Sequence, residues 1–288
     1  MKTMGSSTQP NSRFKIAAPA VVLAGALGFA VSAQAGDFPP DCTIANWGDN
    51  VGLSDDFTGY QGSENRRYGG PCGLRVPFDD AGAAYLIDPS PMAEADYIAR
   101  FYAFLNNAGD EDIIIFAAQD DDGEDQVRVW YNVPAAGDIS LQVFDANDDD
   151  TILTFEDVGS GWHSIEFSWS SDASAEIAFT VDGMDDEVAN VDTSGILIAE
   201  AQLGNVEGTD TGGYVDFDDF VSNRMTRPGR LLRGDANDNG EVNLGDVLAV
   251  RAEALGTSFA AGQPDCNENG EVNLGDVLCT RSLALSGE

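Results

Sequence analysis

The chain has 288 residues, 43% of them hydrophobic, and carries 50 acidic against 14 basic side chains, a formal net charge of −36. This hydrophobic content argues against a disordered acidic chain, because enough apolar surface is present to form a core. The excess of negative charge excludes nucleic acid and anionic membranes as expected partners, since both would repel it.

The first 35 residues have the pattern of a secretory signal peptide. Three basic residues precede a short apolar stretch, Ile16–Ala30, and the cleavage pattern A-x-A ends at Ala35. We therefore expect residues 1–35 to be removed and the protein to be secreted or held at the cell surface. An uncleaved N-terminal anchor is the alternative. No later stretch is long and apolar enough to span a bilayer.

Cleavage would leave a lysine-free chain. Three bases and no acids lie in the first 35 residues, so 11 arginines would remain against all 50 acids. Such an Asp-rich surface stays soluble in salt, where screening shortens charge repulsion to a few ångströms. We expect a saline extracellular environment.

Residues 36–224 are long enough for one large domain and show short strand patterns separated by Gly, Asp and Asn turns. In one of them, Ile165, Phe167 and Trp169 alternate onto a single face. About ten strands and no long helix predict an antiparallel β-sandwich. The clearest expected strands are Tyr97–Leu105, Gln126–Val133, Asp138–Asp145, Trp162–Trp169, Glu176–Val181 and Tyr214–Val221.

Four segments of this region resemble the concanavalin A-like, laminin-G-type jelly roll. They are SDDFTGY (Ser54–Tyr60), GWHSIEFSW, the VDG turn (Val181–Gly183) and VDFDDFVSNR. The resemblance implies a family of lectin-like, carbohydrate-binding and adhesion modules with some glycoside hydrolases. It also implies a calcium site near the joined chain ends, here formed by Asp56 with Asp218 or Asp219. The alternative is that these acids belong to ordinary acidic strand edges.

Nothing in this region marks a catalytic site. Hydrolases of the resembled fold place two acids on one strand as E-x-D-x-x-E or E-x-D-x-E, because glycoside hydrolysis needs a carboxylate pair. That string is absent, and Glu166 stands alone in its strand. His163, the single histidine, is expected to be an exposed strand residue. No nucleophile elbow is present, and the other acid clusters lie in turn-like stretches. We therefore assign no catalytic residue.

Sugar binding by aromatic side chains is the leading expectation for the sandwich, because aromatic faces stack on sugar rings. Neighbours such as Trp130 and Tyr131 face opposite sides of a strand, so at most one of them lines the outer face. Core packing is the alternative for all the candidates. The candidates are Trp47, Tyr102, Trp130, Tyr131 and Trp162.

A short linker, residues 225–233, is expected to follow. Arg224, Arg227, Arg230 and Arg233 fall within ten residues at this point. They are expected either to pair with acids of the neighbouring domains or to be solvated, in which case each pair would contribute little.

Residues 234–288 contain one unit written twice, thirty residues apart, and Asn239–Leu248 is identical to Asn269–Leu278. Such duplication indicates a repeated physical role. Each copy matches a calcium loop, which needs oxygen ligands at positions 1, 3, 5, 9 and 12, a carbonyl at 7 and glycine at 6. The expected ligands are Asp235, Asn237, Asn239, Glu241 (carbonyl), Asn243 and Asp246, then Asp265, Asn267, Asn269, Glu271 (carbonyl), Asn273 and Asp276.

The following segments, Val247–Ala254 and Val277–Leu285, are expected to be helical, and no helix is expected before either loop. A duplicated loop and helix with Asp at position 12 resembles the type I dockerin domain. The resemblance implies two Ca²⁺ ions and calcium-dependent docking to a cohesin domain in either of two orientations. The frequent Ser-Thr pair of the family is absent. The implied partner-binding positions are Leu244, Gly245, Arg251 and Ala252, then Leu274, Gly275, Arg281 and Ser282.

Four cysteines in a secreted chain suggest two disulfides. Cys266 and Cys279 occupy the positions of Ala236 and Ala249 in the first copy. Because both appear in one copy and both are missing from the other, we expect them to be bonded. The two remaining cysteines, Cys42 and Cys72, would then form the second disulfide.

The fold class expected for the whole chain is mostly β, a jelly-roll sandwich followed by a small all-α duplicated calcium loop-helix module. Three functions compete. The leading one is a secreted calcium-binding protein that docks to a cohesin-type partner and presents a non-catalytic carbohydrate-binding or adhesion sandwich to polysaccharide or a cell surface. The alternatives are a glycoside hydrolase and a structural surface protein.

Overall fold

The structure, a computed structural model, describes residues 42–46, 49–59, 66–79, 82–88 and 90–287. The expected signal peptide, Trp47 and Tyr60 lie outside these residues. Among the described residues, no helix is long and apolar enough to cross a membrane.

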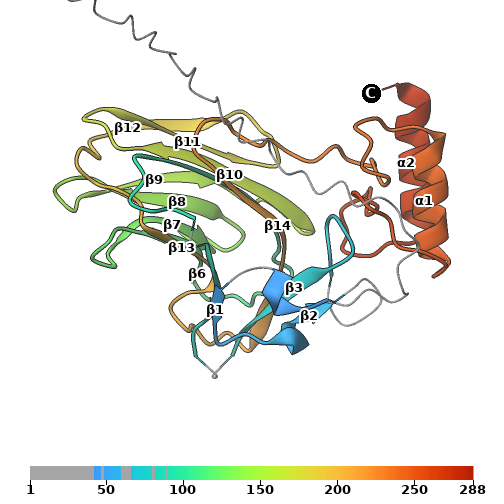
Figure 1. The fold of residues 1–288 in the computed structure, drawn as a ribbon, viewed down its shortest axis with the longest axis horizontal. Coiled ribbons are helices and arrows are strands. Elements are labelled where there is room, and N and C mark those ends of the chain that lie inside the picture. Colours follow the sequence, from blue (N-terminus) through green and yellow to red (C-terminus); the bar gives the residue numbers. More distant parts are fainter. Residues whose placement is uncertain (1–41, 47–48, 60–65, 80–81, 89, 288) are drawn as a thin grey trace, which may run out of the picture. The chain divides into compact units, whose positions relative to one another are not determined.

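Two antiparallel sheets form a jelly-roll-like sandwich, as Figure 1 shows, so the expected mostly β class is confirmed. Within the described residues, one sheet has the order β1 (Asp49–Val51), β4 (Ala84–Asp88), β13 (Glu200–Asn205), β6 (Ile113–Gln119), β7 (Asp125–Tyr131), β8 (Ile139–Phe144), β9 (Asp150–Phe155). The other has the order β12 (Glu187–Val191), β11 (Ala175–Val181), β10 (Trp162–Ser170), β5 (Asp96–Phe104), β14 (Gly213–Asn223), β3 (Gly73–Phe78), β2 (Thr58–Gly59).

The core lies between the two sheets, where alternate residues of each strand point inward. Ile165, Phe167 and Trp169 of β10 are buried there, as their spacing predicts, and Phe167 packs edge-on against Phe116 of β6. Burying an aromatic or large aliphatic side chain of this kind contributes about 1.5–3 kcal/mol. Alternation with period two therefore identifies the inward face correctly.

The central strand β5 is buried on both faces, from Tyr97 to Phe104. Its inward face meets the core, and its outward face carries Tyr102, which belongs to a second buried cluster described below. This double burial explains why the sequence Tyr97–Leu105 has aromatic residues on both sides.

The strand β14 is interrupted by a bulge between Asp218 and Val221, where its pairing with β5 shifts register. Asp219 has φ of 49°, a left-handed conformation that is uncommon for a residue other than glycine. Bulges of this kind redirect side chains. Here the bulge places two adjacent acids on the outward side of the sheet, beside Tyr68 and Arg100.

Both expected disulfides are present. Cys42 is bonded to Cys72, and Cys266 is bonded to Cys279. The first holds the segment with the 3-10 helices η1 (Ile44–Asn46) and η2 (Asp55–Phe57) to the residue that precedes β3. Comparison of the two repeats was sufficient to predict the second bond.

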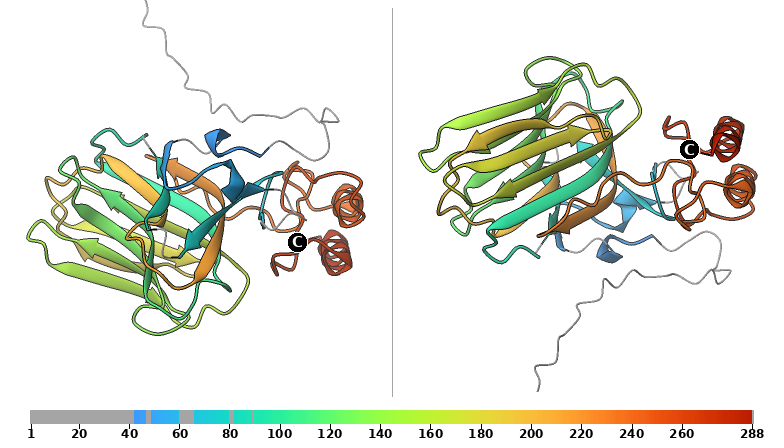
Figure 2. Two further views of the ribbon diagram at one scale, coloured as in Figure 1. Left: turned by 90° about the horizontal axis from the view of Figure 1, so that it is seen from below. Right: turned by 90° about the horizontal axis from the view of Figure 1, so that it is seen from above.

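The C-terminal repeats fold into two loops, each followed by a helix, and the helices α1 (Leu244–Ala254) and α2 (Leu274–Ser286) lie side by side (Figures 1 and 2). Both begin three residues earlier than predicted. Asn243 caps α1 by accepting from the main chain of its first turn, and Asp246 returns the bond to the main chain of Asn243. Such a capping box stabilises the first turn, and α2 repeats it from Asn273.

Candidate functional site

The first and last carboxylates of each repeat organise its loop. Asp235 accepts from the N–H groups of Asn239 at 3.0 Å and Gly240 at 2.7 Å. In the second copy the corresponding bonds to Asp265 measure 3.1 and 2.7 Å. Gly240 has φ of 82°, which is why glycine is needed at this sharp turn.

The last acid of each loop ties the loop to its helix. Asp246 accepts from the N–H groups of Asn237 at 3.0 Å and Asn243 at 2.8 Å. Asp276 accepts from the equivalent asparagines of the second loop at 3.0 and 2.9 Å. The two loops therefore have the same local geometry.

These four carboxylates are buried without a basic partner. Asp246, Asp265 and Asp276 have no exposed surface, and Asp235 is 6% exposed. The ion pairs formed among the described residues include none to any of them. Buried carboxylates without a counter-charge are costly. Two such groups in each loop match the charge of one divalent cation.

The donor set of each loop also suits calcium. Ca²⁺ takes six to eight oxygen ligands from carboxylates, amides and main-chain carbonyls. Within the part of the chain that the structure describes, no group of three or more His, Cys, Asp or Glu is placed to hold a metal. The loops instead combine two carboxylates with asparagine side chains and a main-chain carbonyl, oxygen ligands typical of a hard cation.

The pKa of Asp265 is raised to about 8, first by burial and then by the neighbouring carboxylate of Asp276. The folded-state pKa lies above the unfolded value of about 3.9, so protonated Asp265 stabilises the folded state. This contribution is fully present below pH 3.9 and is lost as the pH rises towards about 8. Chelated protein should therefore melt at a lower temperature at about pH 9 than at about pH 5. Thermal melts in EDTA test this, and Asp265→Asn should flatten the dependence.

Saturating calcium should remove the pH dependence of melting that Asp265 causes, since the cation keeps Asp265 ionised. Asp218 supplies the control, because its pKa is raised to about 7 by burial and by the adjacent Asp219. The contribution of Asp218 to stability should change with pH in the same way with and without calcium. A chelated Asp265→Asn protein with the full pH dependence of the unmodified chain would contradict the assignment.

Exposed leucines form a matching stripe on each helix, at spacings of four, three and four residues with one arginine included. Leu244 and Leu274 are 68% and 69% exposed, and Arg251 and Arg281 are exposed beside them. Sequence reasoning identified these four and missed the other leucines. The helical period of the exposed positions was the signal that could have found them. The stripes comprise Leu244, Leu248 and Arg251 on α1 with Leu255 at its C-cap, and Leu274, Leu278, Arg281 and Leu285 on α2.

The other four residues expected to bind a partner lie on the same two helices. Gly245 and Ser282 are exposed, and Gly275 and Ala252 are half-buried. All eight expected positions are thus at least partly accessible. Whether they contact a partner remains a prediction.

Two residues expected to stack on sugars are buried. Tyr102 has no exposed surface, and Trp162 is 2% exposed. They form a cluster with Tyr68 and Phe104 in which the rings of Tyr68 and Tyr102 stack at 3.7 Å. The expectation that Tyr102 and Trp162 are accessible is therefore wrong, because residues from the linker and second repeat cover this face.

Trp130 and Tyr131 face opposite sides of β7, as expected for neighbours in a strand. Tyr131 packs against the core, whereas the indole N–H of Trp130 donates to Gln142 at 2.8 Å. Both side chains are half-buried, and Trp130 is the candidate that does not pack against the core.

Of the three acids expected to hold a further calcium ion, Asp56 lies apart from the other two. Asp56 is exposed on η2, and among the described residues no interaction joins it to Asp218 or Asp219. Asp218 is buried and accepts from the N–H groups of Tyr68 at 2.5 Å, Gly69 at 2.9 Å and Asp219 at 2.8 Å. Its oxygens already serve the main chain, so a third calcium site remains only a prediction.

Two arginines of the linker, Arg227 and Arg230, pair with acids. Arg227 donates to Glu166 at 2.5 Å and to Asp186 at 2.6 Å, and the N–H of Gly229 donates to the other oxygen of Glu166 at 2.7 Å. Arg230 pairs with Glu268 of the second repeat. The linker thereby lies against β10 and β11, where it helps to enclose a pocket of about 210 Å³.

Glu166 and His163 do not form a recognisable catalytic site. Both oxygens of Glu166 are engaged by the linker. His163 is 3% exposed, so its expected exposure is wrong. Asp182, in the turn after β11, reaches back to His163 Nδ1 at 2.8 Å and to the N–H of Ser164 at 2.9 Å.

No protein-family model matches the chain, and no curated protein is similar enough in sequence to count as a match. Among solved structures, the chain is similar to an endo-β-1,4-glucuronan lyase from the fungus Trichoderma reesei. That match has a TM-score of 0.45 at 13% identity and covers 64% of this chain and 94% of that one.

Two further solved structures have a similar arrangement of strands. A family 7 alginate lyase matches with a TM-score of 0.38 at 15% identity, over 55% of this chain and 80% of that one. The receptor-binding domain of botulinum neurotoxin C/D mosaic serotype matches at 0.42 and 12% identity, over 58% of this chain and 44% of that one. The match thus spans less than half of the toxin domain, and similarity at this level carries no information on function.

Proposed function

We propose that the protein is a secreted, calcium-binding docking protein. In this proposal residues 1–35 are a signal peptide, 36–224 are the sandwich, 225–233 are the linker, and 234–288 are a dockerin-type module that binds two Ca²⁺. The module docks to a cohesin-type domain and presents a non-catalytic sandwich to polysaccharide or to a cell surface. Two disulfides fit an oxidising extracellular location.

The observation that carries the proposal is the duplicated leucine stripe. Leu248 and Leu278 are each 57% exposed at equivalent positions of the two helices. A single exposed leucine needs no explanation, but a repeated apolar stripe in a chain this acidic is typical of an interaction surface. Burying one leucine side chain contributes about 1.5–3 kcal/mol, so the leucines of one stripe would supply a large apolar share of the binding free energy.

We expect calcium binding to determine whether this surface is formed. The helices begin at the capping boxes that Asp246 and Asp276 complete, and these acids are also the last expected ligands of the loops. A cation held by an acid at a helix start would fix the loop and the helix together. Docking should therefore require calcium, because the stripe exists only while both helices are formed.

Docking can be measured by surface plasmon resonance against a panel of type I cohesin domains, in calcium and in EDTA. Two variants each change one stripe, Leu244→Asp with Leu248→Asp and Leu274→Asp with Leu278→Asp. Because the stripe of either helix can dock, each variant should weaken binding by only about twofold, the statistical factor for losing one of two orientations. All four changes together should abolish binding.

Met92 provides the control for docking, since it is 83% exposed and belongs to the sandwich. Met92→Asp should leave binding unchanged. Binding that survives all four leucine changes would refute the stripe as the docking surface. Failure of every cohesin domain to bind in calcium would refute the partner class.

The sandwich is proposed to bind rather than to cleave. Glu166, the glutamate of β10, is held by Arg227 and the N–H of Gly229, so it is not free to act as an acid or a base. The protein should be incubated with insoluble and soluble polysaccharides in calcium buffer, assaying both retention and release of reducing sugar. Retention without release is expected, and release would show a hydrolase or another cleaving activity.

A further inference from the structure

The two calcium loops have almost the same sequence but different surroundings. Over the twelve positions of each loop, they differ only at position 2, where Ala236 is replaced by Cys266, and at position 4, where Asp238 is replaced by Glu268. None of the expected ligands differs. Two loops with equal ligands would bind calcium equally if nothing else contacted them.

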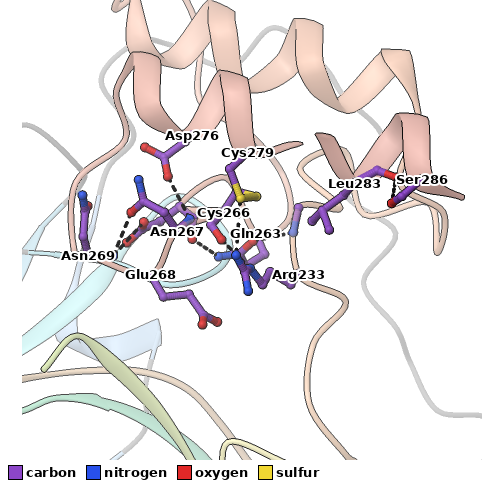
Figure 3. Close-up of a disulfide and its surroundings, with 12 residues drawn as sticks. Arg233, Gln263, Cys266, Asn267, Glu268, Asn269, Asp276, Cys279, Leu283 and Ser286 are labelled. Atoms are coloured by element: carbon purple, nitrogen blue, oxygen red, sulfur yellow. Dashed lines mark hydrogen bonds between the residues drawn. A yellow bond between two sulfur atoms is a disulfide. The ribbon is translucent and has the colours of Figure 1, made fainter. Parts of the chain in front are cut away.

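Each of the two differences forms a contact that the first loop lacks. Cys266 is bonded to Cys279, which ties position 2 of the loop to α2 (Figure 3). Glu268 accepts from the hydroxyl of Tyr68 at 2.6 Å and pairs with Arg230. The second loop is therefore fastened covalently to its own helix and by hydrogen bonds to the sandwich and linker.

The main chain of the second loop also packs against the sandwich. The carbonyl of Glu268 accepts from the N–H of Trp162 at 3.0 Å. Gly161 precedes Trp162 with φ of 116°, and a Cβ there would lie 2.6 Å from that same carbonyl. Gly270 is buried against Phe104 and Arg66, where a Cβ would lie 2.6 Å from both side chains.

The equivalent part of the first loop faces solvent. Asp238 and Gly240 are exposed, and no other described atom lies within 4 Å of a Cβ placed on Gly240. Glu253, at the far end of α1, does pair with Arg67 of the sandwich. That contact holds the helix of the first repeat, whereas Asp238 and Gly240 of its loop stay exposed.

We infer that the second loop is a structural calcium site that locks the C-terminal module onto the sandwich, whereas the first loop is an exchangeable site. This rests on the proposed function, since both loops must bind calcium. In the second loop, the disulfide limits the conformations of the calcium-free chain, and the contacts of Glu268 stabilise the conformation that binds the cation. Preorganisation of this kind raises affinity because less ordering accompanies binding.

The same contacts slow release. For calcium to leave the second loop, the segment 267–270 must move, and it is held by Tyr68, Arg230 and Trp162. Residues 237–240 of the first loop can open into solvent without breaking such contacts. Affinity differences between closely related sites are expressed mostly in the dissociation rate.

The inference is tested by stopped-flow release of Ca²⁺ from the whole chain, purified with both disulfides formed, into an excess of a fluorescent chelator. Two phases of equal amplitude are expected, with rates that differ by at least about tenfold. Asp246→Ala should remove the fast phase, and Asp276→Ala should remove the slow phase. The opposite assignment would overturn the inference.

Two conservative variants distinguish the effect of the Glu268 contacts from the effect of the calcium ligands. Glu268→Gln keeps the size of the side chain but loses its charge, and it should accelerate the slow phase several-fold. Asp238→Asn makes the matched change in the first loop and should leave both phases within about twofold of the unmodified rates. Equal effects of the two variants would refute a role for Glu268.

Failure of the inference and failure of the proposed function give different results. Release of two ions in one phase at one rate would refute the assignment of one structural and one exchangeable site. Both loops would still be calcium sites. No released calcium, with no binding by equilibrium dialysis, would refute both.

Discussion

Chelation of calcium at about pH 9, where Asp265 is ionised, should unfold the C-terminal module and leave the sandwich folded. Four buried carboxylates without a basic partner would repel one another once the cations are removed. A ligand at a thousandfold excess over its dissociation constant stabilises the folded state by about 4 kcal/mol for each site. Circular dichroism should therefore show loss of helix in EDTA, because α1 and α2 lie in this module.

The double variant Asp246→Ala with Asp276→Ala should reproduce chelation, because it removes one carboxylate and one capping interaction from each loop. Glu241→Gln with Glu271→Gln is the matched control. At this position the expected ligand is the main-chain carbonyl, so changing the side chain should leave two bound Ca²⁺ per chain.

Two measurements decide this prediction. Calorimetric titration gives the number of calcium ions bound, and thermal melts with and without EDTA give the stabilisation. Helix content and melting that do not respond to EDTA would show that the module folds without calcium. Two ions bound by the Asp246→Ala, Asp276→Ala variant would show that the ligands lie elsewhere.

Features that depend on neighbouring residues could be predicted from the sequence. The inward faces of β10 and β11 follow from alternation, since Ile165, Phe167 and Phe179 all lie in the core. The Cys266–Cys279 bond follows from comparing two copies of one unit. In both cases the relevant information lies within one strand or one repeat.

The helix boundaries were missed although the signal was present. Asn243 and Asp246 have the spacing of a capping box, an N-cap residue followed three positions later by an acid. The prediction treated both only as metal ligands, so the helix was placed after them. A residue that serves a loop can also serve the first turn of the next helix.

Coverage of one surface by a distant segment could not be predicted. Tyr102 and Trp162 are good candidates for sugar stacking when their strands are considered alone. Leu231 of the linker packs on their cluster, and its N–H donates to the hydroxyl of Tyr102 at 2.8 Å across 129 residues of sequence. No local pattern encodes which face of a sheet a later segment covers.

Replacement of Arg67 by Met should destabilise the calcium-loaded protein by about 3–5 kcal/mol, the cost of breaking a buried ion pair by removing one partner. Arg67 has no exposed side-chain surface and donates to both oxygens of Glu253 at 2.5 Å, 186 residues later in the chain. Equilibrium urea unfolding in saturating calcium measures the change in the free energy of unfolding.

A surface pair supplies the control. Arg128 pairs with Asp125 at 2.7 Å on β7, and its side chain is 27% exposed. Arg128→Gln should cost less than about 1 kcal/mol, because exposed pairs are screened by solvent. A comparable loss for Arg128→Gln and Arg67→Met would mean that burial does not set the importance of the Arg67 pair.

The double variant Arg67→Met with Glu253→Gln distinguishes two causes of the lost stability. One is the loss of the bonds made by Arg67, and the other is the burial of an unpaired Glu253 carboxylate. Glu253 also accepts from the N–H of Ala260 at 2.8 Å, and glutamine can keep that bond. If most of the loss comes from leaving a carboxylate buried alone, the double variant should recover stability relative to Arg67→Met. If it is no more stable, the loss arises from the bonds of Arg67 itself, including the one to the carbonyl of Gly70. Because this pair joins the sandwich to α1, the two variants also measure how strongly the first repeat is held to the sandwich.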